Sequence, residues 1–292
     1  MKKKKKITIF DVVNVILMLF IIFVTLYPLY YVVIASFSNP SLLSRASGFI
    51  WKPIKPYTLL AYEKLFANEL ILIGFKNTLI QLVLGLAVNL ILTIIGAYFL
   101  SLKGLMLKEP ITLMIIFTMY FGGGLVPGYL NLRDLGLLNS VWALILPGAL
   151  STMNLIIMKS SFQALPDSLI ESAKLDGAKH VQMIFLIMVP LCKATIAVLF
   201  LYYGVSHWNS WFPASIYIRD RELYPLQLVA QNILIQTQVG SMSEGIAASD
   251  MAQFAELIKY ALIVVSTVPI LILYPFLQKY FVKGVMVGSI KG

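Results

Sequence analysis

The residues of this chain with the clearest chemical pattern lie together in one polar segment, Leu165–Val181. Pro166 suits the first turn of a helix, where its missing N–H costs nothing. Ser168 and Glu171 fit the S-x-x-E capping box, in which each side chain satisfies a backbone donor of the other residue. Gly177 can end a helix because glycine adopts the left-handed conformation that other residues resist. The segment is therefore predicted to form a short helix of mixed charge, a structure suited to docking a partner.

Patterns that carry catalysis or bind a cofactor are not found in the sequence. Cys192 is the only cysteine, which excludes an intrachain disulfide and a CxxC metal or redox site. His180 and His207 are too far apart in sequence for a local metal motif, so we expect no metal site. Gly240–Gly245 has the glycine spacing of a P-loop but lacks the lysine and the serine or threonine that must follow. The chain is expected to be no enzyme and to hold no cofactor, and an ATP-driven step would need a separate ATPase chain.

The composition is that of an integral membrane protein. Only 12% of the residues are charged and 59% are hydrophobic, whereas a soluble domain has about 25% charged residues. Topology explains the net charge of +10 better than a nucleic-acid partner does. The first apolar run follows Lys2–Lys6 and is about twice as long as that of a signal peptide, so we expect an uncleaved anchor. Runs long enough to span a bilayer cover 12–36, 71–100, 111–130, 140–159, 184–207 and 257–278.

The distribution of charge orients these six predicted spans. With the N-terminus inside the cell, the cytosolic segments hold 14 of the 23 Lys and Arg residues but only 5 of the 13 acidic residues. Lys and Arg accumulate on the cytosolic side of membrane proteins. The N-terminus, the C-terminus and the polar loop at 160–183 are therefore predicted to face the cytosol.

Two segments on the predicted outer side, 37–70 and 212–256, are longer than a connection requires. The first has a short helical pattern near Ala61–Asn68. The second contains Tyr217–Leu226, which is predicted to form a strand or turn at the membrane surface. Both segments could contact an external partner or simply cover the bundle.

The polar loop also resembles a known signature. Glu171–Ala178, followed by Phe185 and Val189-Pro190, resembles the cytosolic EAA signature of ABC importer permeases. Ser172 stands where the signature has its first alanine, and this small-for-small change should still let a partner surface approach closely. The matching residues are Glu171, Ala173, Asp176, Gly177, Ala178 and Pro190.

Other segments resemble one branch of that family. Trp208–Pro213 and the tail Leu277–Gly292 are similar to the carbohydrate-uptake branch, and the tail is similar to that of the second permease subunit of maltose-type importers. Tyr120–Pro127 and Tyr224–Gln227 resemble the subgroup that handles complex or polysaccharide-derived oligosaccharides.

The resemblance implies an all-α, six-span type I ABC importer permease in a bacterial cell membrane, with a cytosolic coupling helix. Residues 1–70 would hold the lysine tail, first span and outer loop, and 71–292 the core permease domain. Implied partners are membrane lipid, a homologous second permease subunit, two cytosolic ATPase subunits that hold ATP and Mg, and an extracellular sugar-binding lipoprotein. Glu171 would meet a basic residue of the ATPase. Gly177→Pro or Glu171→Lys should then uncouple transport.

Alternative functions are an ABC importer for a solute other than sugar, or a membrane scaffold that recruits a cytosolic partner. An ion-coupled carrier is disfavoured because such carriers place ionisable residues within their spans. In this chain those residues, Asp11, Lys76, Lys159 and Lys193, fall near span ends.

Candidate residues for the substrate path come from three patterns. Gln81, Gly85, Asn89, Thr93 and Ala97 recur every four residues and form a stripe that suits helix packing or, less favoured, sugar contact. Gly122–Gly124 with Pro127 should break the third span, and irregular backbone at membrane depth is tolerated where it is buried or lines water. Aromatic residues at the end of the fifth span could be interface anchors or could stack on sugar rings. The candidates are Gln81, Asn89, Tyr120, Gly123, Trp208, Asn209 and Trp211.

Overall fold

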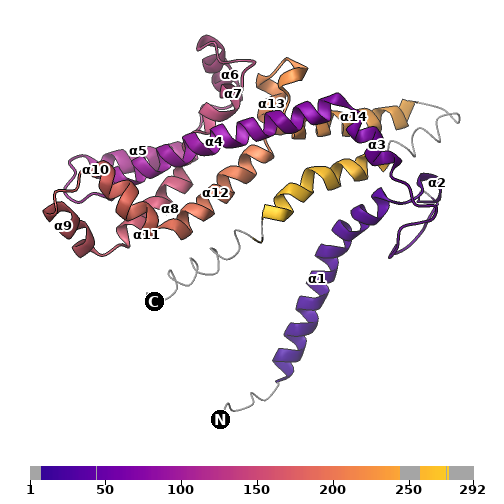
Figure 1. The fold of residues 1–292 in the computed structure, drawn as a ribbon, viewed down its shortest axis with the longest axis horizontal. Coiled ribbons are helices and arrows are strands. Elements are labelled where there is room, and N and C mark those ends of the chain that lie inside the picture. The colour runs from indigo at the N-terminus through magenta and orange to yellow at the C-terminus, as the bar shows by residue number, and fades with distance from the viewer. Residues whose placement is uncertain (1–7, 44, 244–256, 274, 276–292) are drawn as a thin grey trace. The chain divides into compact units, whose positions relative to one another are not determined.

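The computed structural model describes residues 8–43, 45–243, 257–273 and 275 (Figure 1). Within these ranges the chain forms helices joined by turns and loops, without a β-strand. Two compact units comprise the described parts of Met1–Asn68 with Asn232–Val268, and of Glu69–Gln231 with Pro269–Gly292. The predicted all-α class is confirmed. The division into 1–70 and a core permease domain at 71–292 stays a prediction.

The first unit contains α1 (Ile9–Ser36), whose apolar side chains are exposed along most of its length. A capping box starts this helix, because the Asp11 carboxylate accepts from the Thr8 N–H at 2.8 Å and the Thr8 hydroxyl oxygen accepts from the Asp11 N–H. The helical pattern predicted near Ala61–Asn68 is confirmed. Two short helices follow α1 in this unit: α2 (Pro40–Leu43) and α3 (Leu60–Phe66).

The second unit is built around the long helix α4 (Glu69–Ser101), which packs against α8 and α12. α14 (Leu226–Ser243) begins in this unit and continues into the first unit, which also includes most of an apolar helix at Leu257–Leu273. The remaining elements of the second unit are α5 (Lys108–Tyr120), α6 (Leu125–Asp134), α7 (Trp142–Ile145), the 3₁₀ turn η1 (Leu146–Gly148), α8 (Thr152–Gln163), α9 (Asp167–Leu175), α10 (His180–Gln182), the π-helical η2 (Met183–Met188), α11 (Val189–Leu191), α12 (Lys193–Trp208), α13 (Trp211–Tyr217) and the 3₁₀ turn η3 (Arg221–Leu223).

Each predicted span coincides with an apolar helix or helix pair. Among the described residues, α1 and α4 are the two helices long and apolar enough to cross a membrane alone. Three other predicted spans are bent pairs, with angles of 112° between α5 and α6, 53° between α7–η1 and α8, and 87° between α10–α11 and α12. The end of the sixth predicted span lies outside the described residues. Length and composition thus support two to five spans, and the number six stays a prediction.

The structure also tests the predictions for the glycine-rich break and for the outer loop. The predicted break at Gly122–Gly124 is confirmed, because α5 ends before it and α6 begins directly after it. Of the strand or turn predicted for Tyr217–Leu226, the structure has a turn and no strand. The first residue of this segment completes α13, and a 3₁₀ turn covers Arg221–Leu223.

The predicted span at 184–207 is not one straight helix. Met183–Met188 form a π-helical segment, and the chain bends by 87° where α11 meets α12. Proline has no N–H for a continuous helical ladder, and its ring crowds the preceding turn. Pro190 therefore accounts for the irregular helical turn that precedes it, and the 87° bend follows at Cys192.

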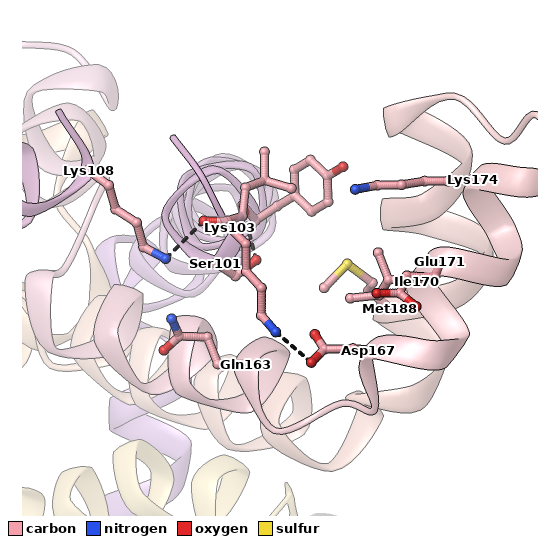
Figure 2. A pocket seen from close by; sticks show the side chains of 11 residues that line it. Ser101, Lys103, Lys108, Gln163, Asp167, Ile170, Glu171, Lys174 and Met188 are labelled. Carbon is pink, nitrogen blue, oxygen red and sulfur yellow. Dashed lines mark hydrogen bonds and ion pairs between the residues drawn. The ribbon is translucent and has the colours of Figure 1, made fainter. Parts of the chain in front are cut away.

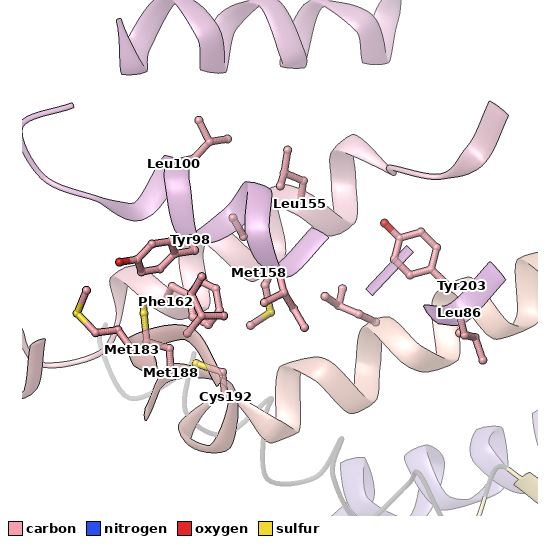
Figure 3. Close-up of a cluster of buried hydrophobic side chains, with 14 of the residues drawn as sticks. Leu86, Tyr98, Leu100, Leu155, Met158, Phe162, Met183, Met188, Cys192 and Tyr203 are labelled. Atoms are coloured by element: carbon pink, nitrogen blue, oxygen red, sulfur yellow. The ribbon is translucent and has the colours of Figure 1, made fainter. Parts of the chain in front are cut away.

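The hydrophobic core of the second unit lies where α4, α8 and α12 meet (Figure 3). Phe162 and Met158 of α8 are almost completely buried and pack with Tyr98 of α4. Met183 and Met188 of η2 extend the same cluster. This core anchors the elements at one end of α4, where the predicted docking segment lies.

Candidate functional site

The polar segment forms α9, which lies with α10 and α11 at one end of α4 (Figure 1). Pro166 is the residue that precedes the helix, and no side chain caps the helix start. The capping box predicted for Ser168 and Glu171 is therefore wrong, because the helix already includes Ser168. Asp167 occupies the first helical position instead, where a carboxylate interacts favourably with the positive end of the helix dipole.

The C-terminus of α9 is closed by Gly177, whose φ is +79°. The N–H of Ala178 donates to the carbonyl of Ala173 at 2.9 Å, and the N–H of Gly177 donates to the carbonyl of Lys174 at 3.0 Å. These two bonds form a Schellman motif, which needs a left-handed residue after the helix. The predicted helix stop is confirmed. Asp176, Gly177 and Ala178 are consecutive positions of this cap.

Two faces of α9 have different environments. Ile170, Ala173 and Ala178 pack against the hydrophobic core of the second unit. Leu175 is 88% exposed, which is unusual for a leucine held in a well-capped helix. The exposed residues near the C-terminal end are Glu171, Ser172, Lys174, Leu175, Asp176 and Gly177. The helix is thus attached through one narrow apolar strip and is otherwise open to a partner.

A cavity of about 530 Å³, called the α9 cavity, lies between α9 and the ends of α4 and α5 (Figure 2). At its edge the Lys103 ammonium donates to the Asp167 carboxylate. The Lys108 ammonium donates to the backbone carbonyl of Leu102 at 2.9 Å. The Glu171 side chain makes no hydrogen bond or ion pair within the described part of the chain. The residues that line the cavity are Tyr98, Ser101, Leu102, Lys103, Lys108, Gln163, Asp167, Ile170, Glu171, Lys174 and Met188.

Removing the Lys103–Asp167 ion pair is expected to have only a small effect. The two side chains are 78% and 57% exposed, and exposed ion pairs contribute about 0.2–1 kcal/mol. Lys103→Ala should therefore lower the thermal unfolding midpoint only slightly in detergent. Arg133→Ala, which removes a similarly exposed pair with Asp134, is the matched control. A Lys103→Ala variant that unfolds far more easily than Arg133→Ala would show that this pair is a main anchor of α9.

A second group of polar side chains lies buried between α4 and α12. The Asn89 amide donates to the backbone carbonyls of Gly148 and Ala149, both at 2.8 Å, at the break between η1 and α8. His207 Nε2 lies 2.7 Å from Asn89 Oδ1. An ideal Cβ on Gly85 would come within 3.0 Å of three atoms of the His207 ring. The packing role favoured for the four-residue stripe is confirmed.

A second cavity, of about 560 Å³, lies beside this buried group and is called the α12 cavity. α7 and η1 form one side, and α12 and α13 form the other. Its walls carry hydroxyl, amide and imidazole groups and no Lys, Arg, Asp or Glu. The lining residues are Ala143, Leu144, Pro147, Gly148, Tyr203, Val205, Ser206, His207, Asn209, Ser210, Pro213 and Tyr217.

The predicted path residues are not brought into one site. Asn209 lines the α12 cavity. Trp208 is only 4% exposed and packs edge-on against Phe75 with ring centres 5.9 Å apart. Trp211 is 40% exposed and contacts Phe212.

The other candidates are equally scattered. Gln81 and Asn89 are buried on α4 with their amides hydrogen-bonded. Tyr120 is 75% exposed at the end of α5, and Gly123 lies in the break that follows. The role of all seven residues in a substrate path stays a prediction.

Sequence reasoning missed four polar residues of the α12 cavity, Tyr203, Ser206, His207 and Ser210. The first three lie within a predicted apolar span, where polar residues are costly and tend to face a cavity or the bundle interior. The Tyr203 hydroxyl accepts from the Ser151 N–H at 3.0 Å.

The fold and these sites define a helical membrane protein with an exposed helix that ends in a Schellman motif. The chain belongs to the family of binding-protein-dependent transport system inner membrane components, whose family model matches residues 105–287. It is thus the permease component of an ABC transport system, as the resemblance of the polar loop predicted.

Individual relatives agree with this assignment. Protein LplC of Bacillus subtilis (strain 168) is 38% identical, with the match covering 97% of this chain and 95% of the relative. The polygalacturonan/rhamnogalacturonan transport system permease protein YtcP of the same strain is also 38% identical, over 97% of this chain and 99% of the relative. A chain in the crystal structure of a bacterial ABC transporter involved in the import of the acidic polysaccharide alginate matches with a TM-score of 0.85. That chain is 29% identical, and the match covers 96% of this chain and 99% of the other.

Proposed function

We propose that this chain is a transmembrane subunit of an ATP-driven importer for oligosaccharides and that α9 connects it to the ATPase. The similar proteins named above for polygalacturonan/rhamnogalacturonan transport and alginate import support a saccharide cargo. ATP and Mg²⁺ are bound by separate ATPase subunits, and the sugar is first bound by an extracellular binding protein. A homologous second permease subunit completes the bundle.

The observation that carries this proposal is the exposed face of α9. The helix is fixed at its end by the Schellman motif at Gly177 and attached through Ile170 and Ala173. Its remaining surface offers Leu175 for apolar contact and Glu171 for a basic partner group. A partner that grips such a helix can push or pull it as one rigid piece, and the core at α4, α8 and α12 transmits the motion.

The orientation of the chain in the membrane follows from the proposed contact between α9 and the ATPase. α9 must face the cytosol to meet an ATPase, so both termini lie in the cytosol and the α12 cavity lies toward the opposite side. The excess of Lys and Arg in the predicted cytosolic segments supports this orientation. The protein works in a bacterial cell membrane, surrounded by lipid.

Glu171→Lys is expected to release the ATPase from the purified complex. Charge-assisted hydrogen bonds contribute about 1.5–3 kcal/mol, and each 1.4 kcal/mol is about tenfold in affinity. Retention of the ATPase during affinity purification of the tagged permease should therefore fall by about tenfold or more. Glu109→Lys is the matched control, since Glu109 is an exposed glutamate in the first turn of α5. The control should retain the ATPase.

Two results would overturn the proposal. Glu171→Lys that retains the ATPase and takes up oligosaccharide normally would remove the docking role. A wild-type complex that binds the ATPase but shows neither oligosaccharide uptake nor ATPase stimulation by sugar-loaded binding protein would identify a scaffold instead.

A further inference from the structure

We propose that the α12 cavity is a binding site for an uncharged sugar unit and excludes the carboxylate of a uronic acid. This inference rests on the proposed saccharide import and adds a specificity-determining site within this chain. A volume of about 560 Å³ lies within the range of small-molecule sites.

The first argument is the state of His207, the one lining group that could carry a charge. The Asn89 amide nitrogen donates to two carbonyls, which fixes its oxygen toward His207. That oxygen, 2.7 Å away, must then accept from Nε2–H of the imidazole. The Ser210 hydroxyl has acceptors in the His207 carbonyl at 2.8 Å and Gln81 Oε1 at 3.2 Å, and its oxygen accepts from Gln81 Nε2 at 2.8 Å.

The same Gln81 nitrogen lies 3.4 Å from His207 Nδ1, which therefore acts as an acceptor. An imidazole that donates through Nε2 and accepts through Nδ1 is neutral. His207 thus contributes no positive charge to the cavity.

The second argument is the supply of unused polar groups. Within the described part of the chain, the Ser206 hydroxyl, the Asn209 side-chain amide and the Tyr217 hydroxyl make no hydrogen bond. These groups are uncharged and can both donate and accept, as sugar hydroxyls do. The partly exposed ring of Tyr217 on the same lining adds flat apolar surface. A pyranose has a matching combination of hydroxyl edge and apolar face.

The third argument is electrostatic. Moving a carboxylate out of water without a cationic or strongly donating partner is costly. The nearby arginine Arg219 does not line the cavity, and its guanidinium donates to the Tyr129 hydroxyl at 2.9 Å. A uronate would therefore find no counterion in the cavity, whereas a neutral hexose needs none.

The test compares two ligands of equal size and linkage, α-1,4-galactotriose and trigalacturonate. Each is added to the permease complex in nanodiscs, without external binding protein, and binding is measured by saturation-transfer-difference NMR. Galactotriose should bind at least about tenfold more tightly than trigalacturonate, which corresponds to about 1.4 kcal/mol.

Two variants locate the site. Asn209→Ala should weaken galactotriose binding severalfold, and Ser206→Lys should raise trigalacturonate binding relative to galactotriose. Ser215→Lys is the control, because Ser215 is exposed on α13 outside the cavity lining. It should leave both ligands unchanged.

Equal binding of the two ligands, no binding of galactotriose, or identical behaviour of Ser206→Lys and Ser215→Lys would each overturn the inference. The proposed import function is measured separately, as oligosaccharide uptake by the complete transporter. Uptake without selective binding in the cavity would refute this site alone.

Discussion

Replacing Gly177 with proline is expected to reduce oligosaccharide uptake severely while leaving the permease folded in the membrane. Proline holds φ near about −65°, whereas Gly177 has a φ of +79°. The substitution also removes the N–H that donates to the Lys174 carbonyl. The end of α9 must then unwind or change direction, so a partner that grips the helix loses its rigid contact. Uptake should fall by about tenfold or more, which a loss of only about 1.4 kcal/mol of docking energy would produce.

The chain itself supplies a matched control at Gly136. α6 ends in the same Schellman motif, with Leu137 N–H bonded to the Leu132 carbonyl at 2.9 Å and Gly136 at a φ of +67°. A Cβ at either glycine would meet nothing within 4 Å, so side-chain crowding is absent from both comparisons. Gly136→Pro should keep the co-purified ATPase, whereas Gly177→Pro should lose it.

Gly177→Asn provides a rescue, because asparagine tolerates the left-handed conformation better than other side chains do. Uptake should return toward the wild-type level. If Gly177→Pro transports normally, or if Gly136→Pro loses the ATPase to the same extent, the cap of α9 has no special role in coupling.

The sequence allowed the elements to be placed because their signals are local. Apolar length located α1 and α4, three consecutive glycines located the break before α6, and Gly177 located the end of α9. Each of these depends on residues within a few positions of one another. The same holds for the polar stripe on α4, whose four-residue spacing predicted a packed face.

What could not be predicted depends on contacts between distant residues. The bend between η1 and α8 leaves backbone carbonyls without helical partners, and Asn89, some sixty positions earlier, satisfies two of them. Hydropathy is the same for a straight and a bent apolar segment, so it gave no sign of this bend. The misplaced start of α9 is a different case, since the helix begins at Asp167, one residue before Ser168, and no side chain caps it.

Replacing Asn89 with leucine is expected to destabilise the permease more than the loss of an exposed ion pair or a half-buried hydrogen bond. Leucine has a similar volume but leaves the carbonyls of Gly148 and Ala149 and the Nε2–H of His207 without their partner. Asn89 itself is completely buried. An unsatisfied buried polar group costs about 1–3 kcal/mol, so the free energy of unfolding should fall by about 3 kcal/mol or more. Unfolding by titration with SDS in mixed micelles measures it.

Asn77→Leu is the control that separates burial from hydrogen-bond number. Asn77 lies on the same helix, and its amide also donates to two backbone carbonyls, those of Glu222 at 2.7 Å and Tyr224 at 3.1 Å. It is only half-buried, so water can replace the lost bonds, and the expected cost is about 1 kcal/mol. Equal losses for the two variants would mean that water reaches the break beside η1. A larger loss of unfolding free energy for Asn89→Leu would mean that this side chain stabilises the bent span at a place that water does not reach.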